Sequence, residues 1–315
     1  MIIKTSCMSN VGGRTTNDDT ASIYQEAGRA WVYVGDGLGS YAGGKRASKT
    51  AGEALLAIAK KGGMLSKEKL TEAAVAADKA VKKLQKETKG NMKTTLVFLA
   101  VEEGKARWMH VGDSRLYHFR DGKVLKQTTD HSVSQMAVFM GEITTHEIRF
   151  HEDRNKVLRA LGGENAKAEV SEEVELAEGR DAFLLCTDGF WEYVYEEEME
   201  KCLKEAESPK DWIRRMEKIL QTRVPSDNDN FTAAALICAA KKEKPAPAPQ
   251  KKKPFWKKST PAAAHPGGGF IVSKNAPVGA GAPTARIPDA SDPPIRSEER
   301  GVLPPGRRGR RPLRI

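Results

Sequence analysis

Long hydrophobic runs are absent from this sequence of 315 residues. No stretch approaches the roughly 18 consecutive apolar residues that a membrane-spanning helix needs, and the apolar part of the N-terminal MIIKTSCMSN is too short for a signal peptide. Cysteine is scarce as well: the four cysteines form no CxxC pair, which argues against a zinc site or a redox motif. Cys186 and Cys238 lie in apolar runs, as small core residues do. These features predict a soluble cytoplasmic protein with reduced cysteines.

Proline is scarce in the first 240 residues, which hold two of the 16 prolines. Residues 241–315 hold the other 14, together with 17 Lys and Arg against 5 Asp and Glu. The formal charge of +10 therefore divides into +12 for residues 241–315 and −2 for residues 1–240, which argues against a wholly basic nucleic-acid-binding fold. The composition of residues 241–315 predicts a disordered tail, and residues 1–240 are long enough to form one folded domain.

The first 240 residues alternate between strand-like and helix-like segments. Runs rich in β-branched and aromatic residues predict strands at 31–34, 95–101, 106–111, 182–186 and 232–238. An Asp-Gly dipeptide between 116–119 and 123–126 predicts a hairpin. Apolar periodicity predicts helices at 46–61, after a Ser66 cap and from Pro209 onward. Hairpins mixed with paired helices favour an α+β fold built on antiparallel sheets.

Aspartates recur at turns, most of them directly after a strand-like run. Those that stand out are Asp18, Asp36, Asp113, Asp188 and Asp229. A single Asp-Gly dipeptide usually marks only a turn, as expected at Asp121-Gly122 in the hairpin. Recurrence from separate parts of the chain instead predicts a shared carboxylate cluster, which repels itself unless divalent cations neutralise it. Ligands that are all oxygens favour Mg²⁺ or Mn²⁺.

Eight segments, taken in order, resemble the motifs of the metal-dependent protein phosphatase family (PPM, type 2C), and of its bacterial branch in particular. They are NVGGRTTNDDTA, VYVGDGLGSYAGGKRAS, KTTLVFLAV, HVGDSRLYHFR, TTDHS, LRALGG, LLCTDGFWE and DNFT. The resemblance covers about residues 1–240 and implies a central sandwich of two antiparallel sheets flanked by helices. It also implies hydrolysis of phosphoserine and phosphothreonine in proteins by a water that bridges two metal ions, with two or three Mn²⁺ or Mg²⁺ ions as cofactors.

The same resemblance implies roles for individual residues. The metal ligands that it implies are Asp18, Asp36, Gly37 through its carbonyl oxygen, Asp188 and Asp229, with Asp36 bridging both ions. The residues expected to support the site or to hold a third, weaker ion are Asp19, Asp113 and Glu192. Arg14 is expected to hold the substrate phosphate, because a guanidinium grips phosphate with two donors. Arg14 and Asp36 are therefore the predicted catalytic residues.

Five positions depart from the family's usual pattern. Leu38 stands where many members carry a histidine assigned as a general acid, so protonation of the leaving group stays unassigned. Lys93 replaces a usual glycine, Ser40 and Lys45 replace a common Gly and Glu, and Asp18 is shorter than the usual Glu. None of these changes removes a carboxylate that the resemblance assigns to a metal.

Two further features each allow two interpretations. His131 in TTDHS is either a catalytic residue or a structural hydrogen-bonding residue, and the second is more common for a lone histidine. Residues 132–155, with His146 and His151, resemble the family's mobile flap beside the site, which would govern substrate access. The alternative for this segment is a loop and helix of purely structural use.

Other functions and partners remain open from the sequence. A pseudophosphatase would bind phosphoproteins as a scaffold without hydrolysis, but it predicts lost metal ligands. The KKKPFWKK and GRRGRR segments of the tail suit an anionic membrane or nucleic acid, and a solvated linker is the alternative. The resemblance implies phosphorylated proteins as partners and signalling opposed to a Ser/Thr kinase. A monomer is expected, cytoplasmic or peripheral to the membrane through its tail.

Overall fold

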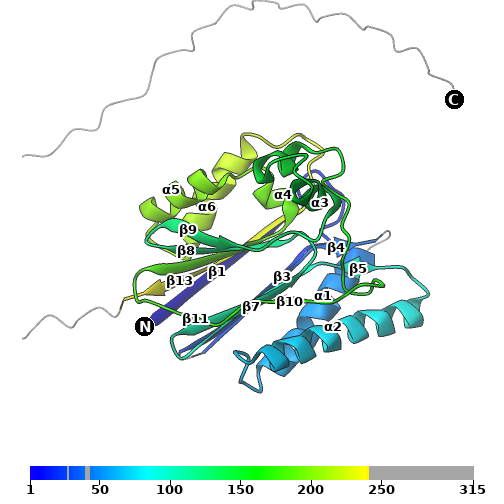
Figure 1. The fold of residues 1–315 in the computed structure, drawn as a ribbon, viewed down its shortest axis with the longest axis horizontal. Coiled ribbons are helices and arrows are strands. Elements are labelled where there is room, and N and C mark those ends of the chain that lie inside the picture. The colour runs from blue at the N-terminus through cyan, green and yellow to red at the C-terminus, as the bar shows by residue number, and fades with distance from the viewer. Residues whose placement is uncertain (27, 40–42, 241–315) are drawn as a thin grey trace, which may run out of the picture. The chain divides into compact units, whose positions relative to one another are not determined.

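Two antiparallel sheets lie face to face, and helices cover the outer face of each (Figure 1). This arrangement comes from a computed structural model that describes residues 1–26, 28–39 and 43–240. The predicted α+β sandwich is thereby confirmed. The predicted tail, residues 241–315, lies outside the described residues, as does Ser40.

The first sheet contains both ends of the folded part of the chain. Its strands, in spatial order, are β1 (Ile2–Asn10), β13 (Phe231–Ala239), β12 (Asp181–Cys186), β8 (Arg115–Arg120) and β9 (Lys123–Gln127). The second sheet has the order β10 (Glu169–Val170), β7 (Lys105–Val111), β6 (Leu96–Glu102), β3 (Arg29–Gly35) and β2 (Thr20–Glu26), and β11 (Val174–Glu175) also pairs with β7. A separate two-stranded sheet joins β4 (Gly37–Leu38) to β5 (Lys93–Thr94).

The helices form two outer layers. The second sheet is covered by α1 (Gly43–Ala59) and α2 (Lys67–Thr88), and the first sheet by α5 (Glu196–Glu205) and α6 (Pro209–Gln221) (Figure 1). Shorter helices lie toward one end: α3 (Val133–Phe139), the 3₁₀ helix η1 (Thr145–Phe150) and α4 (Asp188–Trp191). Apolar residues fill three layers, one between the sheets and one beneath each helix pair. Each fully buried aliphatic or aromatic side chain contributes about 1.5–3 kcal/mol.

Local signals place several of these elements where the sequence predicts them. The Ser66 side chain accepts a hydrogen bond from the Lys69 N–H and caps α2, and α6 begins at Pro209. The hairpin turn between β8 and β9 has positive φ at Asp121 and Gly122, as its Asp-Gly sequence predicts. Cys186 and Cys238 are buried, and all four cysteines are free.

Sequence patterns miss the two N-terminal strands. The nine residues of β1 include Lys, Thr, Ser and Asn, and their weak hydrophobic signal reflects a strand at the edge of the described sheet, next to β13. In β2 no residue is fully buried, and only Ala21 and Ile23 pack against the core between the sheets, so the hydrophobic signal of this strand is weak. Tertiary pairing decides the conformation of both segments.

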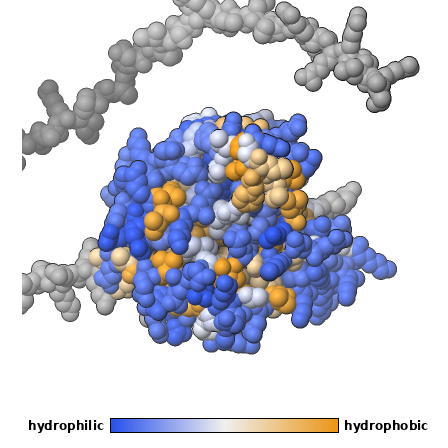
Figure 2. Space-filling view, in the orientation of Figure 1, coloured by the Kyte–Doolittle hydropathy of each residue, from blue (hydrophilic) through white to orange (hydrophobic). Residues whose placement is uncertain are grey.

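The surface of the described residues has two features, which concern its helices and its exposed apolar side chains. None of the helices within the described residues is long and apolar enough to cross a membrane. Hydrophobic side chains gather on the surface over α3 and η1 (Figure 2), where Met136, Phe139, Met140 and Phe150 are each 45–66% exposed. This exposed apolar group lies within the segment that resembles a flap.

Candidate active site

Segments from four parts of the chain bring the acidic residues predicted to bind metal to one end of the sandwich. Asp36 follows β3, and Asp188 begins α4 just after β12. Asp18 lies before β2, and Asp229 lies before β13. Because these strands are antiparallel, the ends of β3 and β12 and the starts of β2 and β13 meet at the same edge.

A cavity of about 520 Å³ opens at this edge. It is lined by Arg14, Asp18, Asp36, Gly37, Asp188 and Asp229, among others. The structure therefore brings together all the residues predicted to hold two metal ions, together with the predicted phosphate-binding arginine. The remaining predicted residues, Asp19, Asp113 and Glu192, do not line the cavity; the first two are buried and Glu192 is largely so.

The carboxylates raise one another's pKa values. Burial raises the pKa of Asp36 well above its usual value, and the charges of Asp188, Asp19 and other neighbours add to this. The pKa of Asp188 is also raised well above its usual value by burial and then by Asp113 and Glu192. Burial raises the pKa of Asp113 to about 7 and that of Asp19 to about 6. The cluster thus opposes its own ionisation.

Several carboxylate oxygens lack a partner. In the part of the chain that the structure describes, Asp18 Oδ1, Asp19 Oδ1 and Asp113 Oδ1 are buried without a hydrogen bond. An unpaired buried carboxylate oxygen is costly, whereas a divalent cation would supply both a ligand bond and neutralising charge. A donor set made only of oxygens suits Mg²⁺ or Mn²⁺. The residues present therefore fit such ions.

Two threonines hold the backbone of Asp36. The Asp36 carbonyl accepts hydrogen bonds from Thr95 N and from Thr94 Oγ1, and the Asp36 N–H donates to Thr95 Oγ1, each at 2.8 Å. Thr95 Oγ1 also lies 2.7 Å from Ser114 Oγ, next to Asp113. The sequence alone does not indicate this role for Thr94 and Thr95, although a polar pair before a buried strand is its visible signal.

Glycines allow β4 and α1 to approach closely. A Cβ atom on Gly37 would lie 2.2 Å from the Gly44 carbonyl oxygen, and one on Gly44 would lie 2.8 Å from Asp18 Oδ2. Both distances are shorter than any real contact of a Cβ atom, so these positions require glycine. Lys45, at the next position, donates its ammonium to the Asp19 carbonyl oxygen. The start of α1 thereby holds the Asp18-Asp19 pair.

Asn230 joins the two terminal segments of the site. Its side chain accepts from the Asp18 N–H at 2.8 Å and donates to the Val11 and Thr16 carbonyl oxygens at 2.8 and 2.9 Å. Because Asn230 directly follows Asp229, this network fixes Asp18 relative to Asp229 across more than 200 residues of sequence. In the sequence Asn230 stands out only as part of the DNFT motif, which does not indicate that its side chain holds Asp18.

Arg14 faces the cavity next to a predicted metal ligand. Its guanidinium Nη2 lies 3.0 Å from Asp229 Oδ2, and the Arg14 side chain is 54% exposed.

Glu192 forms an ion pair with the flap-like segment, because Arg154 Nε lies 3.1 Å from Glu192 Oε1. Arg154 belongs to the flap-like segment, so this ion pair attaches that segment to the acidic site.

The contacts of His131 support its structural interpretation. His131 Nδ1 accepts a hydrogen bond from the Gly112 N–H at 3.1 Å, and its ring stacks on His110 at 4.6 Å between centroids. Its backbone also pairs with Gly112, since the His131 N–H donates to the Gly112 carbonyl at 2.9 Å. His131 therefore holds the loop that carries Asp113.

The flap-like segment is anchored at its end. Arg149 donates to both carboxylate oxygens of Glu196 and to the Trp191 carbonyl, and Ile148 is buried. Asn155, the last residue of the segment, lines the aspartate cavity. The segment therefore lies beside the site, where the resemblance places it.

Comparisons with known proteins agree with these observations. The family model described as Protein phosphatase 2C matches residues 9–228. The chain is 32% identical over 232 residues to the serine/threonine protein phosphatase PstP of Mycobacterium tuberculosis, covering 71% of this chain and 43% of PstP. It is 31% identical over 201 residues to the serine/threonine phosphatase stp of Listeria innocua, covering 61% of this chain and 79% of that relative. This chain thus spans less than half the length of PstP.

A solved structure gives the same result for the fold. The catalytic domain of PstP, in complex with 2 manganese ions, superposes with a TM-score of 0.64 at 28% sequence identity. The match covers 76% of this chain and 99% of that domain. On the motifs, the two-sheet sandwich, the cluster of aspartates and the family match, this chain belongs to the protein phosphatase 2C family.

Proposed function

We propose that the protein is a metal-dependent phosphatase that hydrolyses phosphoserine and phosphothreonine in proteins. The observation that carries the proposal is the set of four aspartates lining one cavity, Asp18, Asp36, Asp188 and Asp229, beside Arg14. A pseudophosphatase would be expected to lack some of these carboxylates, and all four are present. The family match and the phosphatases among its relatives support the same activity.

Each residue has a proposed role. The residues that would hold two Mn²⁺ or Mg²⁺ ions are Asp18, Asp36, Gly37, Asp188 and Asp229, with Asp36 shared by both. Those that would support the site or hold a third ion are Asp19, Asp113 and Glu192. When bound, the ions lower the pKa of the attacking water and offset charge on the phosphoryl group. The raised pKa values of Asp36 and Asp188 mean that cations and protons compete for the cluster.

Arg14 would bind and orient the substrate phosphate. Its guanidinium is half exposed and bonded to Asp229 through a single nitrogen, so other donors remain free for phosphate oxygens. Leu38 lines the same cavity and has no proton to donate. Protonation of the leaving alkoxide therefore does not come from this position.

The test is metal-dependent turnover of the full-length protein on phosphoserine and phosphothreonine peptides. We expect phosphate release with Mn²⁺ or Mg²⁺ and none in excess EDTA, and Asp36→Asn should lower kcat by orders of magnitude. Asp121→Asn is a matched control, because Asp121 also precedes a glycine but lies at the exposed hairpin turn. Undiminished activity in EDTA would contradict the proposal.

Partners and location are proposals that rest on the sequence. We propose that a monomer acts in the cytoplasm on proteins phosphorylated by a Ser/Thr kinase, and that the basic residues 241–315 direct it to an anionic membrane surface. The charge of +12 on those residues supports this, because each Lys or Arg adds about 1 kcal/mol near such a surface. Removing residues 241–315 should shift the protein out of the membrane fraction while peptide turnover is retained. Unchanged fractionation would count against the membrane proposal.

A further inference from the structure

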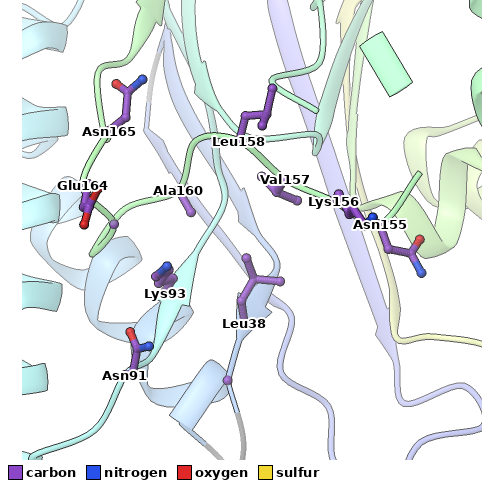
Figure 3. A pocket seen from close by; sticks show the side chains of 12 residues that line it. Leu38, Asn91, Lys93, Asn155, Lys156, Val157, Leu158, Ala160, Glu164 and Asn165 are labelled. Carbon is purple, nitrogen blue, oxygen red and sulfur yellow. The ribbon is translucent and has the colours of Figure 1, made fainter. Parts of the chain in front are cut away.

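A second cavity, of about 690 Å³, adjoins the aspartate cavity, and Figure 3 shows the side chains that line it. The two share Leu38, Gly39, Asn155 and Val157 in their linings. We call the second cavity the side groove. From the shared residues it extends to Lys93 and to Glu164 and Asn165. A polypeptide whose phosphorylated residue lies at the aspartates therefore has a continuous path into the side groove.

Strand pairing fixes Lys93 relative to the aspartates. In the β4–β5 sheet Leu38 pairs with Lys93 and Gly37 pairs with Thr94, so Lys93 lies beside Leu38 in the lining of the groove (Figure 3). The next residue, Thr94, donates its hydroxyl to the Asp36 carbonyl at 2.8 Å. Lys93 is thus placed by the same backbone that places Asp36.

The wall of the side groove opposite Lys93, formed by residues 160–165, is hydrogen-bonded to β5, the strand that contains Lys93. Thr94 and Leu161 exchange two backbone hydrogen bonds, at 3.1 and 2.8 Å. Gln85 on α2 donates to the carbonyl oxygens of Met92 and Gly162, at 2.7 and 2.9 Å, and so joins the two walls. The side groove is therefore preformed, and a bound segment would not have to order it.

The ammonium of Lys93 has no bonded partner in the groove among the described residues. Lys93 is half-buried and forms no ion pair or hydrogen bond through its ammonium within the described residues. Lys156 also lines the groove, but its ammonium lies 2.7 Å from Asp153 Oδ1. Glu164, an acidic residue of the lining, is exposed and forms no ion pair with Lys93. A partly desolvated, unpaired ammonium attracts an anion more strongly than one in open water.

The rest of the lining suits a peptide. Asn91, Asn155 and Asn165 are exposed amides that both donate and accept hydrogen bonds, as the backbone of an extended peptide requires. Leu38, Val157 and Leu158 add apolar contact. The lining thus combines amide and apolar groups with the ammonium of Lys93, while its one carboxylate, that of Glu164, is exposed to solvent.

We propose that the side groove binds the substrate polypeptide next to its phosphorylated residue, and that Lys93 selects substrates with an anionic residue there. The anionic group is a carboxylate of Asp or Glu or a second phosphate, since both present oxygens to the ammonium. This inference rests on the proposed phosphatase function. It adds a specificity-determining residue at the position where the sequence departs from the usual glycine.

The test compares phosphothreonine peptides that differ only in neighbouring residues: neutral, acidic on one side, acidic on the other, or with a second phosphoresidue. The ratio of kcat/KM between the best anionic peptide and the neutral one should be about 5 for the wild-type protein. The difference should lie in KM, because an interaction kept throughout the reaction changes binding alone. The phosphorylated and carboxylate peptides distinguish the two sources of the anion.

The same ratio of kcat/KM, between the best anionic peptide and the neutral one, is measured for variants of Lys93. This ratio does not depend on the fraction of enzyme that is folded. Lys93→Gln should bring it to about 1, Lys93→Glu below 1, and Lys93→Arg should keep it. Lys79→Gln, at an exposed lysine of α2 that forms no ion pair with any other described residue, should leave it at the wild-type value. A ratio near 1 for the wild-type protein, or one unchanged in Lys93→Gln, would overturn this proposal while leaving the phosphatase function intact. Absence of turnover on every peptide and on an aryl phosphate would overturn both.

Discussion

The sandwich contains two kinds of buried carboxylate, and they differ in what surrounds them. At the acidic end, Asp19 and Asp113 each keep one buried oxygen without a hydrogen bond in the described structure. Elsewhere, Asp130 and Asp181 are equally buried, yet both oxygens of each are bonded. The cost of removing a carboxylate from water is similar in the two regions, so the partners make the difference.

The paired carboxylates are satisfied within the chain. Asp130 accepts two hydrogen bonds from Arg115, at 2.9 and 2.7 Å, and that guanidinium lies 3.4 Å above the Trp191 ring. Burial opposes ionisation of Asp181, but hydrogen bonds from Arg120, Ala177 and His118 outweigh it and lower its pKa. These groups need nothing from outside the protein.

The unpaired carboxylates have no such partner, and their pKa values are raised instead. Buried carboxylates with a structural role therefore have both oxygens bonded within the protein. Buried carboxylates of the site each have an oxygen without a hydrogen bond among the described residues. An incomplete buried cluster is costly to the folded protein and is relieved by a cation that binds only the folded state. A buried carboxylate oxygen without a hydrogen bond therefore indicates the functional site more specifically than the presence of acidic residues does.

The largest expected effect comes from removing one carboxylate of the unpaired group. Asp188→Asn should lower kcat by about 1000-fold at saturating Mn²⁺, because the asparagine has no charge to hold a cation. Its free energy of unfolding without metal should stay the same or rise, since like-charge repulsion from Asp113 and Glu192 is removed. Peptide turnover and urea denaturation on the same preparation test this, and wild-type turnover would contradict it.

Removing a carboxylate whose oxygens are both bonded should instead lower the free energy of unfolding. Asp130→Ala leaves the Arg115 guanidinium, which is 1% exposed, buried and unpaired, and should lower the free energy of unfolding by about 3–5 kcal/mol. Urea denaturation measures this change.

The exposed pair of Asp121 and Arg180 serves as the control. Both side chains are more than half exposed, and asparagine tolerates the positive φ of this position, so Asp121→Asn should cost less than about 1 kcal/mol. Equal losses for the Asp130 and Asp121 variants would show that burial does not distinguish the two pairs.

A smaller effect is expected from pH in the metal-free protein. Burial, and then the charge of Asp130, raises the pKa of Asp113 from 3.8 to about 7. Its contribution to stability is fully present below its unfolded value and is lost as the pH rises through about 7. In EDTA the wild-type Tm should therefore fall between pH 5 and pH 8, and Asp113→Asn should recover about 3 °C or more of it at pH 8.

Saturating Mn²⁺ provides the control for this pH dependence. The cation neutralises the cluster, so the fall in wild-type Tm between pH 5 and pH 8 should shrink. Thermal denaturation at both pH values, with and without Mn²⁺, gives the comparison. A Tm that rises with pH in EDTA would reverse the sign and contradict the assignment of raised pKa values.

Sequence reasoning recovers the elements whose signals are local. The Ser66 cap, the Pro209 start and the Asp-Gly hairpin turn each depend on a few neighbouring residues, and the structure agrees. The strand β1 is missed because its pairing partner, β13, lies more than 200 residues away in the chain. The strand β2 pairs with the adjacent β3 and is missed because its mostly polar, partly exposed residues give a weak signal. Position and pairing in the sheet decide their conformation, and neither is visible in a single segment.

For the site, the turn aspartates are recognisable because most of them directly follow or precede a strand. Their supports are not, since Asn230 holds Asp18 and Thr187 donates to Asp19 Oδ2 at 2.8 Å from distant parts of the chain. Lys93 is visible in the sequence as a departure from a usual glycine. Only the β4–β5 register shows that its charge lies in a groove continuous with the aspartates.

The sequence by itself determines the family, the acidic residues available for metal and the division of charge between residues 1–240 and 241–315, because these depend on residue type and order. The tertiary structure decides which buried carboxylates find an arginine and which stay unpaired. It also decides that the Lys93 ammonium, within the described residues, has no ion pair or hydrogen bond beside the site. These properties depend on contacts between residues far apart in the chain, and such contacts exist only once the two sheets have packed.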